Sequence, residues 1–175
     1  GLTFAELPEL NDVDRPGDLA PLRGDPRFAE VFGAPQGLSV VIPALNEEGY
    51  VAGAVRSALE GATDVIVVDG GSLDRTCAVA EAAGARVLRV EGGRAAQQNA
   101  GARAARGRVL LFLHADTRLP PGYADAVRGA LAPPHVTAGA FRLRIDGPGR
   151  ALRAVEWGAN VRSHLLQFPY GDQAL

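Results

Sequence analysis

The sequence predicts an α/β domain built on a doubly wound, mostly parallel sheet. Four short, β-branched apolar runs alternate with segments whose apolar residues recur at helical spacing. Alternation of this kind, with crossovers long enough for right-handed βαβ units, is typical of a parallel sheet covered on both faces. A polar cluster follows each apolar run, and folds of this class bind ligands at the carboxyl ends of their strands.

The elements are expected in a regular series after residue 37. A first strand spans residues 38–42, and Pro43 would end its pairing because proline has no amide hydrogen. A helix follows, since apolar residues recur at the spacing of one helical face at Val51, Val55, Ala58 and Leu59. The series continues with a strand over 65–68, a helix over 74–83, a strand over 86–90, a helix over 94–106 and a strand over 109–113.

Two further elements are expected beyond the fourth strand. Residues 136–145 alternate apolar side chains with arginines and predict an added antiparallel strand. Residues 150–166 predict a last helix, whose apolar face consists of Leu152, Val155, Ala159 and Leu166. Trp157 and Arg162 lie off this face, where they either border a substrate site or form a packed aromatic ring and a solvated charge. Packing is favoured for Trp157, because tryptophan usually serves it.

Composition limits the class of protein. A chain of 175 residues, 47% of them hydrophobic and 22% charged, suits one domain with room for a fragment of another. The net charge of −2 argues against a nucleic-acid binder. Cys77 is the one cysteine, which excludes an internal disulfide and predicts a small buried group in a helix. No apolar stretch approaches about 20 residues and no signal peptide is visible, so a cytoplasmic protein without a membrane span is expected.

An acidic, glycine-rich turn follows the second predicted strand. Asp69 stands at the carboxyl end of that strand, where it could accept hydrogen bonds from a nucleobase or a ribose. Gly70 and Gly71 would let the backbone approach a ligand, and Ser72 or Asp74 would cap the next helix. The alternative is that these residues only make a tight turn between a strand and a helix.

His114 and Asp116 follow the fourth predicted strand. A carboxylate at this position suits Mg²⁺ or Mn²⁺, which take oxygen ligands and bridge to substrate phosphates. His114 is an acceptable second ligand for Mn²⁺ and a poor one for Mg²⁺. The alternative is that Asp116 and Thr117 make an ordinary turn that leads to Pro120 and Pro121.

Glycines and Arg94 open the helix that follows the third strand. The free amides of a helix N-terminus favour anions and Arg94 adds positive charge, so a diphosphate is the expected ligand. An ordinary helix start, with small residues such as Gly101 packed closely on the sheet, is a compatible alternative. The sequence has no GxGxxG after a strand and no GxxxxGK[ST], which removes support for dinucleotide and P-loop sites.

Four of these segments together resemble glycosyltransferase family 2, which has the GT-A fold, and they are residues 41–48, 68–76, 93–99 and 111–117. More narrowly, they resemble its arsenosugar-biosynthesis-type, or selenodomain-associated transferase 2, group. Residues 157–163 and 169–173 resemble that group too. The resemblance covers residues 38–175 and makes them the nucleotide-sugar-binding part of such a domain.

The resemblance implies a nucleotide-diphosphate sugar donor and an inverting transfer to an acceptor hydroxyl, with a metal that neutralises the departing diphosphate. It places Asp116 at the second Asp of the family's DxD metal motif, and His114 where many members have the first. The residues that would line the donor are Pro43, Asn46, Glu47, Asp69, Gly70, Gly71, Arg94 and Gln98. Those that would border the acceptor are Trp157, Arg162, Asp172 and Gln173.

The sequence departs from the family pattern at its carboxyl end. Family members continue to an acidic Glu-Asp motif that is thought to supply the catalytic base, and this sequence stops at Leu175. The domain is therefore expected to be truncated there. Asp172 is the one late acidic candidate for the base, although ordering the acceptor pocket is its more natural role. A chain that lacks part of its domain would expose apolar surface, which favours a homodimer or aggregation.

Residues 1–37 resemble the closing segment of the nucleotidyltransferase-like transferase 1 family. This resemblance implies the tail of a preceding GT-A-like domain, and the alternative is a simple N-terminal extension. Three functions remain open: a metal-dependent glycosyltransferase with an unidentified acceptor, a catalytically inactive nucleotide-binding domain, and a sugar-phosphate nucleotidyltransferase. The last lacks the GxGxR-type loop that would hold a triphosphate.

Overall fold

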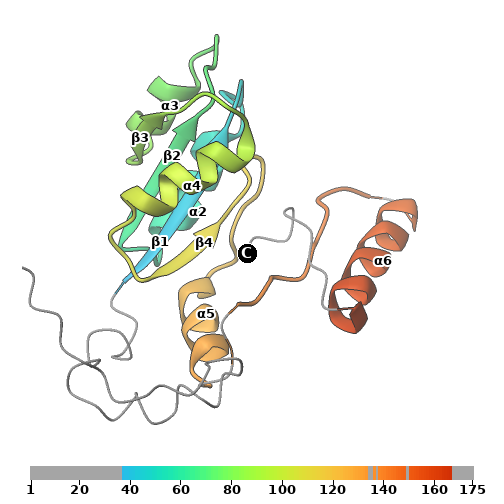
Figure 1. Cartoon of the computed structure of the whole chain (residues 1–175). Coiled ribbons are helices and arrows are strands. Elements are labelled where there is room, and N and C mark those ends of the chain that lie inside the picture. Colours follow the sequence, from blue (N-terminus) through green and yellow to red (C-terminus); the bar gives the residue numbers. More distant parts are fainter. Residues whose placement is uncertain (1–36, 134–135, 137, 149, 167–175) are drawn as a thin grey trace, which may run out of the picture.

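The computed structural model describes residues 37–133, 136, 138–148 and 150–166 (Figure 1). Its sheet consists of β1 (Leu38–Ala44), β2 (Asp64–Asp69), β3 (Arg86–Arg89) and β4 (Val109–Phe112). The strand order is β3-β2-β1-β4 and every pairing is parallel. The crossovers contain α2 (Val51–Leu59), α3 (Thr76–Ala82) and α4 (Arg94–Ala104), and α5 (Tyr123–Leu131) and α6 (Arg150–Leu166) follow. The predicted doubly wound α/β fold is confirmed. The tail assigned to residues 1–37 lies almost wholly outside the described residues.

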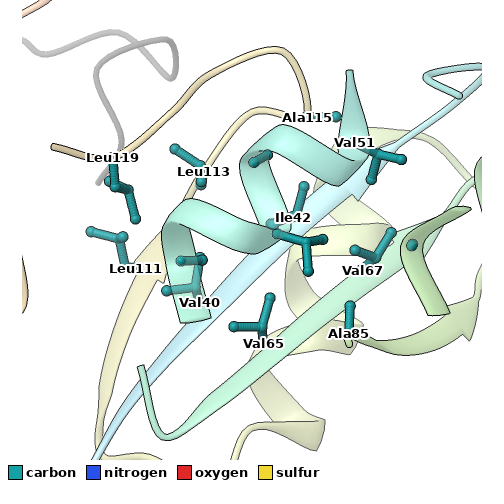
Figure 2. Close-up of a cluster of buried hydrophobic side chains, with 14 of the residues drawn as sticks. Val40, Ile42, Val51, Val65, Val67, Ala85, Leu111, Leu113, Ala115 and Leu119 are labelled. Atoms are coloured by element: carbon teal, nitrogen blue, oxygen red, sulfur yellow. The ribbon is translucent and has the colours of Figure 1, made fainter. Parts of the chain in front are cut away.

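The two faces of the sheet carry separate apolar clusters because side chains alternate along each strand. On one face, Val40, Ile42 and Val67 pack beneath α2, which Figure 2 shows lying across them. On the other face, Val41 and Val68 pack against residues of α4. Both central strands are buried on both faces, as expected of apolar runs in a parallel sheet.

Pro43 lies inside β1 rather than at its end. It pairs in register with Val68, and the strand continues to Ala44. The carbonyl of Val41, two residues earlier, accepts from Leu113 N–H on the β4 side, so an amide hydrogen at position 43 would point to the same side. Strand β4 ends at Phe112, before it reaches the level of Pro43. Pro43 is therefore tolerated in a central strand because β4 offers no backbone partner for an amide hydrogen at this position.

A glycine allows α4 to lie close to the sheet. Gly101 is buried, and a Cβ built there would lie 2.3 Å from Val41 Cγ1 and 3.1 Å from Val68 Cγ2. Neither valine can move easily, since both are buried in the central strands. The close packing predicted for Gly101 is confirmed.

We expect Gly101→Ala to lower the free energy of unfolding by about 2 kcal/mol, because the added methyl overpacks this contact. Gly129→Ala is the matched control: it also lies in a helix, α5, and a Cβ there meets nothing within 4 Å. It should raise stability by about 0.5–1 kcal/mol through its better helix propensity. Urea unfolding of both variants measures the difference, and equal effects would contradict the close approach of α4.

Helix α5 is absent from the sequence-based prediction, which has only a turn at Pro120 and Pro121. Its buried Tyr123 donates a hydrogen bond to the carbonyl of Ala58, at the end of α2. Burial raises the pKa of Tyr123 to about 12, so the hydroxyl keeps its proton and this bond at physiological pH. The sequence does carry a signal, because Tyr123, Val127 and Leu131 recur at helical spacing.

The antiparallel strand predicted for residues 136–145 is wrong for the part that is described. The backbone groups of Leu143 and Ile145 bond to side chains of α6 instead of to a strand. The Asn160 amide accepts from Leu143 N–H at 2.8 Å and donates to the Leu143 carbonyl at 3.0 Å, and Glu156 accepts from Ile145 N–H. These side chains satisfy the extended backbone as a neighbouring strand would.

The last helix forms over the predicted range but packs differently. Figure 1 shows α6 beside the extended segment and away from the sheet. Val155 is 57% exposed and Trp157 is 71% exposed. The packing role favoured for Trp157 is therefore wrong, and Val155 is not on a buried face. The sequence pattern failed here because an apolar stripe along a helix does not indicate whether another surface packs against it.

Leu59, predicted on the inner face of α2, is exposed as well. No helix among the described residues has the length and apolarity needed to cross a bilayer.

We expect Asn160→Ala to release the extended segment, since both backbone groups of Leu143 lose their partner. Amide hydrogen exchange at Leu143 should accelerate by about fivefold, corresponding to roughly 1 kcal/mol of local stability. Trp157→Ala, on the same helix but exposed, should leave this exchange unchanged. Equal exchange at Leu143 in the two variants would show that α6 does not hold the segment.

Candidate functional site

The loops that follow β1 and β2 are joined to each other by hydrogen bonds. Asn46 N–H donates to Ser72 Oγ at 2.8 Å, and Asn46 Oδ1 accepts from Leu73 N–H at 2.9 Å. Asn46 has a φ of +56°, a left-handed conformation that asparagine tolerates better than most residues. The predicted convergence of these two polar clusters is confirmed.

A second set of hydrogen bonds joins the same two loops at positions nearer to the starts of α2 and α3. Glu47, which is half-buried, donates its N–H to Thr76 Oγ1 at 2.7 Å, and Glu48 donates its own to Asp74 at 3.1 Å. Asp74 also accepts from the N–H and the hydroxyl of Thr76, the first residue of α3, but the N-cap position is occupied by Arg75 rather than by Ser72 or Asp74 as predicted. The hydroxyl of Thr76 is the main cause that lowers the pKa of Asp74.

Asp69 organises the glycine turn. Its side chain is buried, at 1% residue exposure, and Oδ2 accepts from Gly71 N–H at 3.1 Å and Ser72 N–H at 3.0 Å. Burial alone would raise the pKa of Asp69, but the hydrogen bonds from Ser72, Gly71 and Cys77 lower it overall. The turn-forming alternative is thus observed, and Gly71 is required in it by its φ of +98°. Cys77 is half-buried rather than buried.

Gln97 joins the ends of the two central strands, a role that the sequence analysis did not predict. Its Nε2 donates to the carbonyl of Ala44 at 2.9 Å and to that of Val68 at 2.8 Å. A Cβ at Gly70 would lie 2.9 Å from the same nitrogen, so glycine is needed there for close approach. The available signal was the spacing of Gln97 and Gly101, which puts both on the inner face of α4.

The segments that follow β3 and β4 also meet. Arg94 Nη1 lies 3.5 Å from His114 Nε2, at the outer limit of hydrogen-bond distance. Thr117 N–H donates to the His114 carbonyl at 3.1 Å, which closes a turn that buries Ala115 and exposes Asp116. Thr117 Oγ1 donates to Asp116 Oδ1 at 3.1 Å. The predicted turn therefore forms, and it presents the Asp116 carboxylate to solvent.

The exposed carboxylate of Asp116 fits a divalent metal that is shared with a substrate. Mg²⁺ in particular is usually bound by one or two carboxylates together with substrate phosphates and water. Within the described part of the chain, no group of three or more His, Cys, Asp or Glu side chains could hold a metal ion. A metal at this edge would thus be completed by oxygens of the ligand.

The remaining predicted site residues are not brought to this edge by any recorded contact. Gln98 is half-buried on α4, and Trp157 is exposed on α6. Arg162 belongs to α6, although its side chain is not described. Asp172 and Gln173 lie outside the described residues.

The architecture and the position of the polar loops define a class of protein. A parallel β3-β2-β1-β4 sheet flanked by helices, with loops cross-linked at its carboxyl edge, is a GT-A-like α/β fold. Residues 39–173 match the family model described as glycosyl transferase family 2. The chain belongs to glycosyl transferase family 2.

Solved structures were found that resemble this chain over part of its length. Staphylococcus aureus TarS, residues 1–349, has 22% identity and a TM-score of 0.57 over 65% of this chain and 38% of that chain. Mycobacterium tuberculosis glucosyl-3-phosphoglycerate synthase has 31% identity and a TM-score of 0.44 over 53% of this chain and 38% of that chain. The chain thus matches well under half of either structure. TarS supports the fold alone. No curated protein matches the sequence.

We expect Asp69→Asn to lower the free energy of unfolding at neutral pH by about 2 kcal/mol, because the amide loses charge-assisted bonds to Gly71 and Ser72. The pKa of Asp69 is lowered from its ordinary 3.8 on folding, so its contribution is present above that pH and lost as the pH falls below it. Urea unfolding between pH 3 and 7 should therefore show the two proteins converging below about pH 4.

Asp125→Asn is the control, because Asp125 forms only an exposed ion pair with Arg128 on α5. It should change stability by less than about 0.5 kcal/mol. An Asp69→Asn deficit that stays constant down to pH 3 would contradict the ionised, hydrogen-bonded carboxylate.

Proposed function

We propose that this chain carries the donor half of an inverting glycosyltransferase, which transfers a sugar from a nucleotide-diphosphate sugar to an acceptor hydroxyl. The family match supports the reaction class. The observation that carries the proposal is the meeting of four strand-end segments at one sheet edge, where Asp69 ends β2, Arg94 follows β3 and Asp116 follows β4. Such an edge is where open α/β sheets bind nucleotides.

The proposed donor site is fixed in place before ligand binds. The loops carrying Asn46, Glu47 and Asp69 are held by hydrogen bonds to one another, so the surface facing a nucleoside need not reorganise. Gly71 leaves this surface open, since a Cβ there would meet nothing within 4 Å, and Gly70 makes room for Gln97 behind it. Pro43 of β1 and Gln98 of α4, neither of which is exposed, are assigned to the border of the site.

The phosphate end of the donor would lie toward the other two segments. Arg94 is exposed and offers a planar set of N–H donors that suits phosphate oxygens. Asp116 would hold Mg²⁺ or Mn²⁺ jointly with those oxygens. A bound metal would stabilise the negative charge of the departing diphosphate.

The acceptor half of the site is assigned to the carboxyl-terminal residues. We place Trp157 and Arg162 of α6 at its border, together with Asp172 and Gln173. Inversion needs a base that removes the proton of the acceptor hydroxyl as it attacks, and Asp172 is the candidate among these residues. A catalytically inactive nucleotide-binding domain is the second candidate function, because His114 stands where many members of the family have the first Asp of the metal motif.

We expect the chain to bind UDP or GDP more tightly with Mn²⁺ than without it. Asp116→Asn should remove most of this metal-dependent gain, at least about tenfold in affinity, because it replaces an anionic ligand. Titration calorimetry with each nucleotide, with and without Mn²⁺, makes the measurement. Asp125→Asn, which removes an equal charge on α5, should bind as the unaltered chain does.

A folded chain that binds neither nucleotide under any condition would contradict the proposed donor site. Binding by a protein that releases no sugar from UDP- or GDP-sugars, even when extended to the full family length, would favour the inactive nucleotide-binding domain.

A further inference from the structure

Arg94 and His114 connect segments that leave opposite edges of the sheet. Arg94 begins α4 after β3, and His114 follows β4, yet Arg94 Nη1 and His114 Nε2 lie 3.5 Å apart. Arg94 is exposed and His114 is half-buried, so a ligand can reach the pair. The two side chains therefore meet at the edge where the diphosphate is proposed to lie.

In the observed geometry, the contact directs the Nε2 lone pair of a neutral His114 toward Arg94 rather than toward a metal. A guanidinium only donates, so in a neutral imidazole Nε2 must be the acceptor and Nδ1 must carry the hydrogen. His114 then offers its Nδ1 N–H to its surroundings, and an N–H group suits phosphate oxygens rather than cations.

We infer that Arg94 and His114 together form a metal-independent contact to the diphosphate, and that His114 is not a ligand of the metal. This inference rests on the proposed donor site. Asp116 is then the one carboxylate of this turn that faces a cation. Arg94 keeps further N–H groups free after its contact with His114, because its guanidinium has five.

The arrangement changes the affinity of the site for a diphosphate in the absence of metal. Two carboxylates in one turn would repel the phosphates until a cation arrived. With His114 at the first position, one of those charges is replaced by a hydrogen-bond donor that lies beside Arg94. The site should therefore keep part of its affinity for a nucleoside diphosphate without any metal.

The first experiment measures metal binding directly. Mn²⁺ is titrated into the 175-residue chain in the presence of UDP or GDP and followed by electron paramagnetic resonance. We expect His114→Ala to change the apparent Mn²⁺ affinity by less than about twofold, and Asp116→Asn to lower it by at least about tenfold. Spin-echo modulation of the bound Mn²⁺ should show no coupling to a coordinated imidazole nitrogen.

The second experiment measures diphosphate binding without metal. UDP, GDP and inorganic pyrophosphate are titrated in the presence of a chelator. Arg94→Gln and His114→Ala should each weaken binding by about three- to tenfold, and the double variant by less than the product of the two. Arg103→Gln is the matched control, because it removes the same charge from the exposed far end of α4.

A gain-of-function variant separates the two roles of position 114. His114→Asp should raise the Mn²⁺ affinity and weaken metal-free binding of UDP and GDP by more than His114→Ala does, because a carboxylate attracts the cation and repels the phosphates. Urea unfolding confirms that each variant remains folded.

The outcomes distinguish this inference from the function on which it rests. Loss of Mn²⁺ affinity in His114→Ala, or a nitrogen coupling on bound Mn²⁺, would overturn the inference while nucleotide binding still supported the donor site. Unchanged metal-free binding in both single variants would also overturn it. Absence of nucleotide binding by the unaltered chain, with metal or without, would overturn both.

Discussion

The close approach of α4 to the two central strands is the constraint on which the site depends. Gly101 lets the helix lie against Val41 and Val68, and Gln97, one turn earlier, binds the carbonyls of Ala44 and Val68. These contacts lie within two turns of the helix start, so they also determine where Arg94 stands. A helix held further from the sheet could not bring Arg94 to His114.

The strand-end loops are held in place by their own hydrogen bonds. Their polar groups bond largely to one another, as the bonds between Asn46 and Ser72 and those around Asp69 show. A loop that has already satisfied its backbone loses little entropy when a ligand binds. Asp69 illustrates this point, because it shapes the turn through Gly71 and Ser72 in the absence of any ligand. Its role in the site is therefore structural first, whatever contact it makes with a ligand.

The carboxyl-terminal part follows a different principle from the sheet. Helix α6 holds the extended segment through the side chains of Asn160 and Glu156. Trp157 stays exposed beside these contacts. Side-chain bonds of this kind fix a local register without burying much surface, so this region keeps polar and aromatic groups exposed while the sheet provides the stability.

The alternation of strands and helices over residues 38–113, and the edge of the sheet that carries the polar loops, could be predicted from the sequence, because apolar runs such as Val65–Val68 and helical spacing are local properties of the chain. The same local patterns identified Asp69, Arg94 and Asp116 as residues of that edge. Which side chains satisfy one another depended instead on tertiary packing. Gln97 rather than Gln98 faces the strands, and His114 meets Arg94, because these contacts depend on how closely a helix packs across the sheet, which no local pattern encodes.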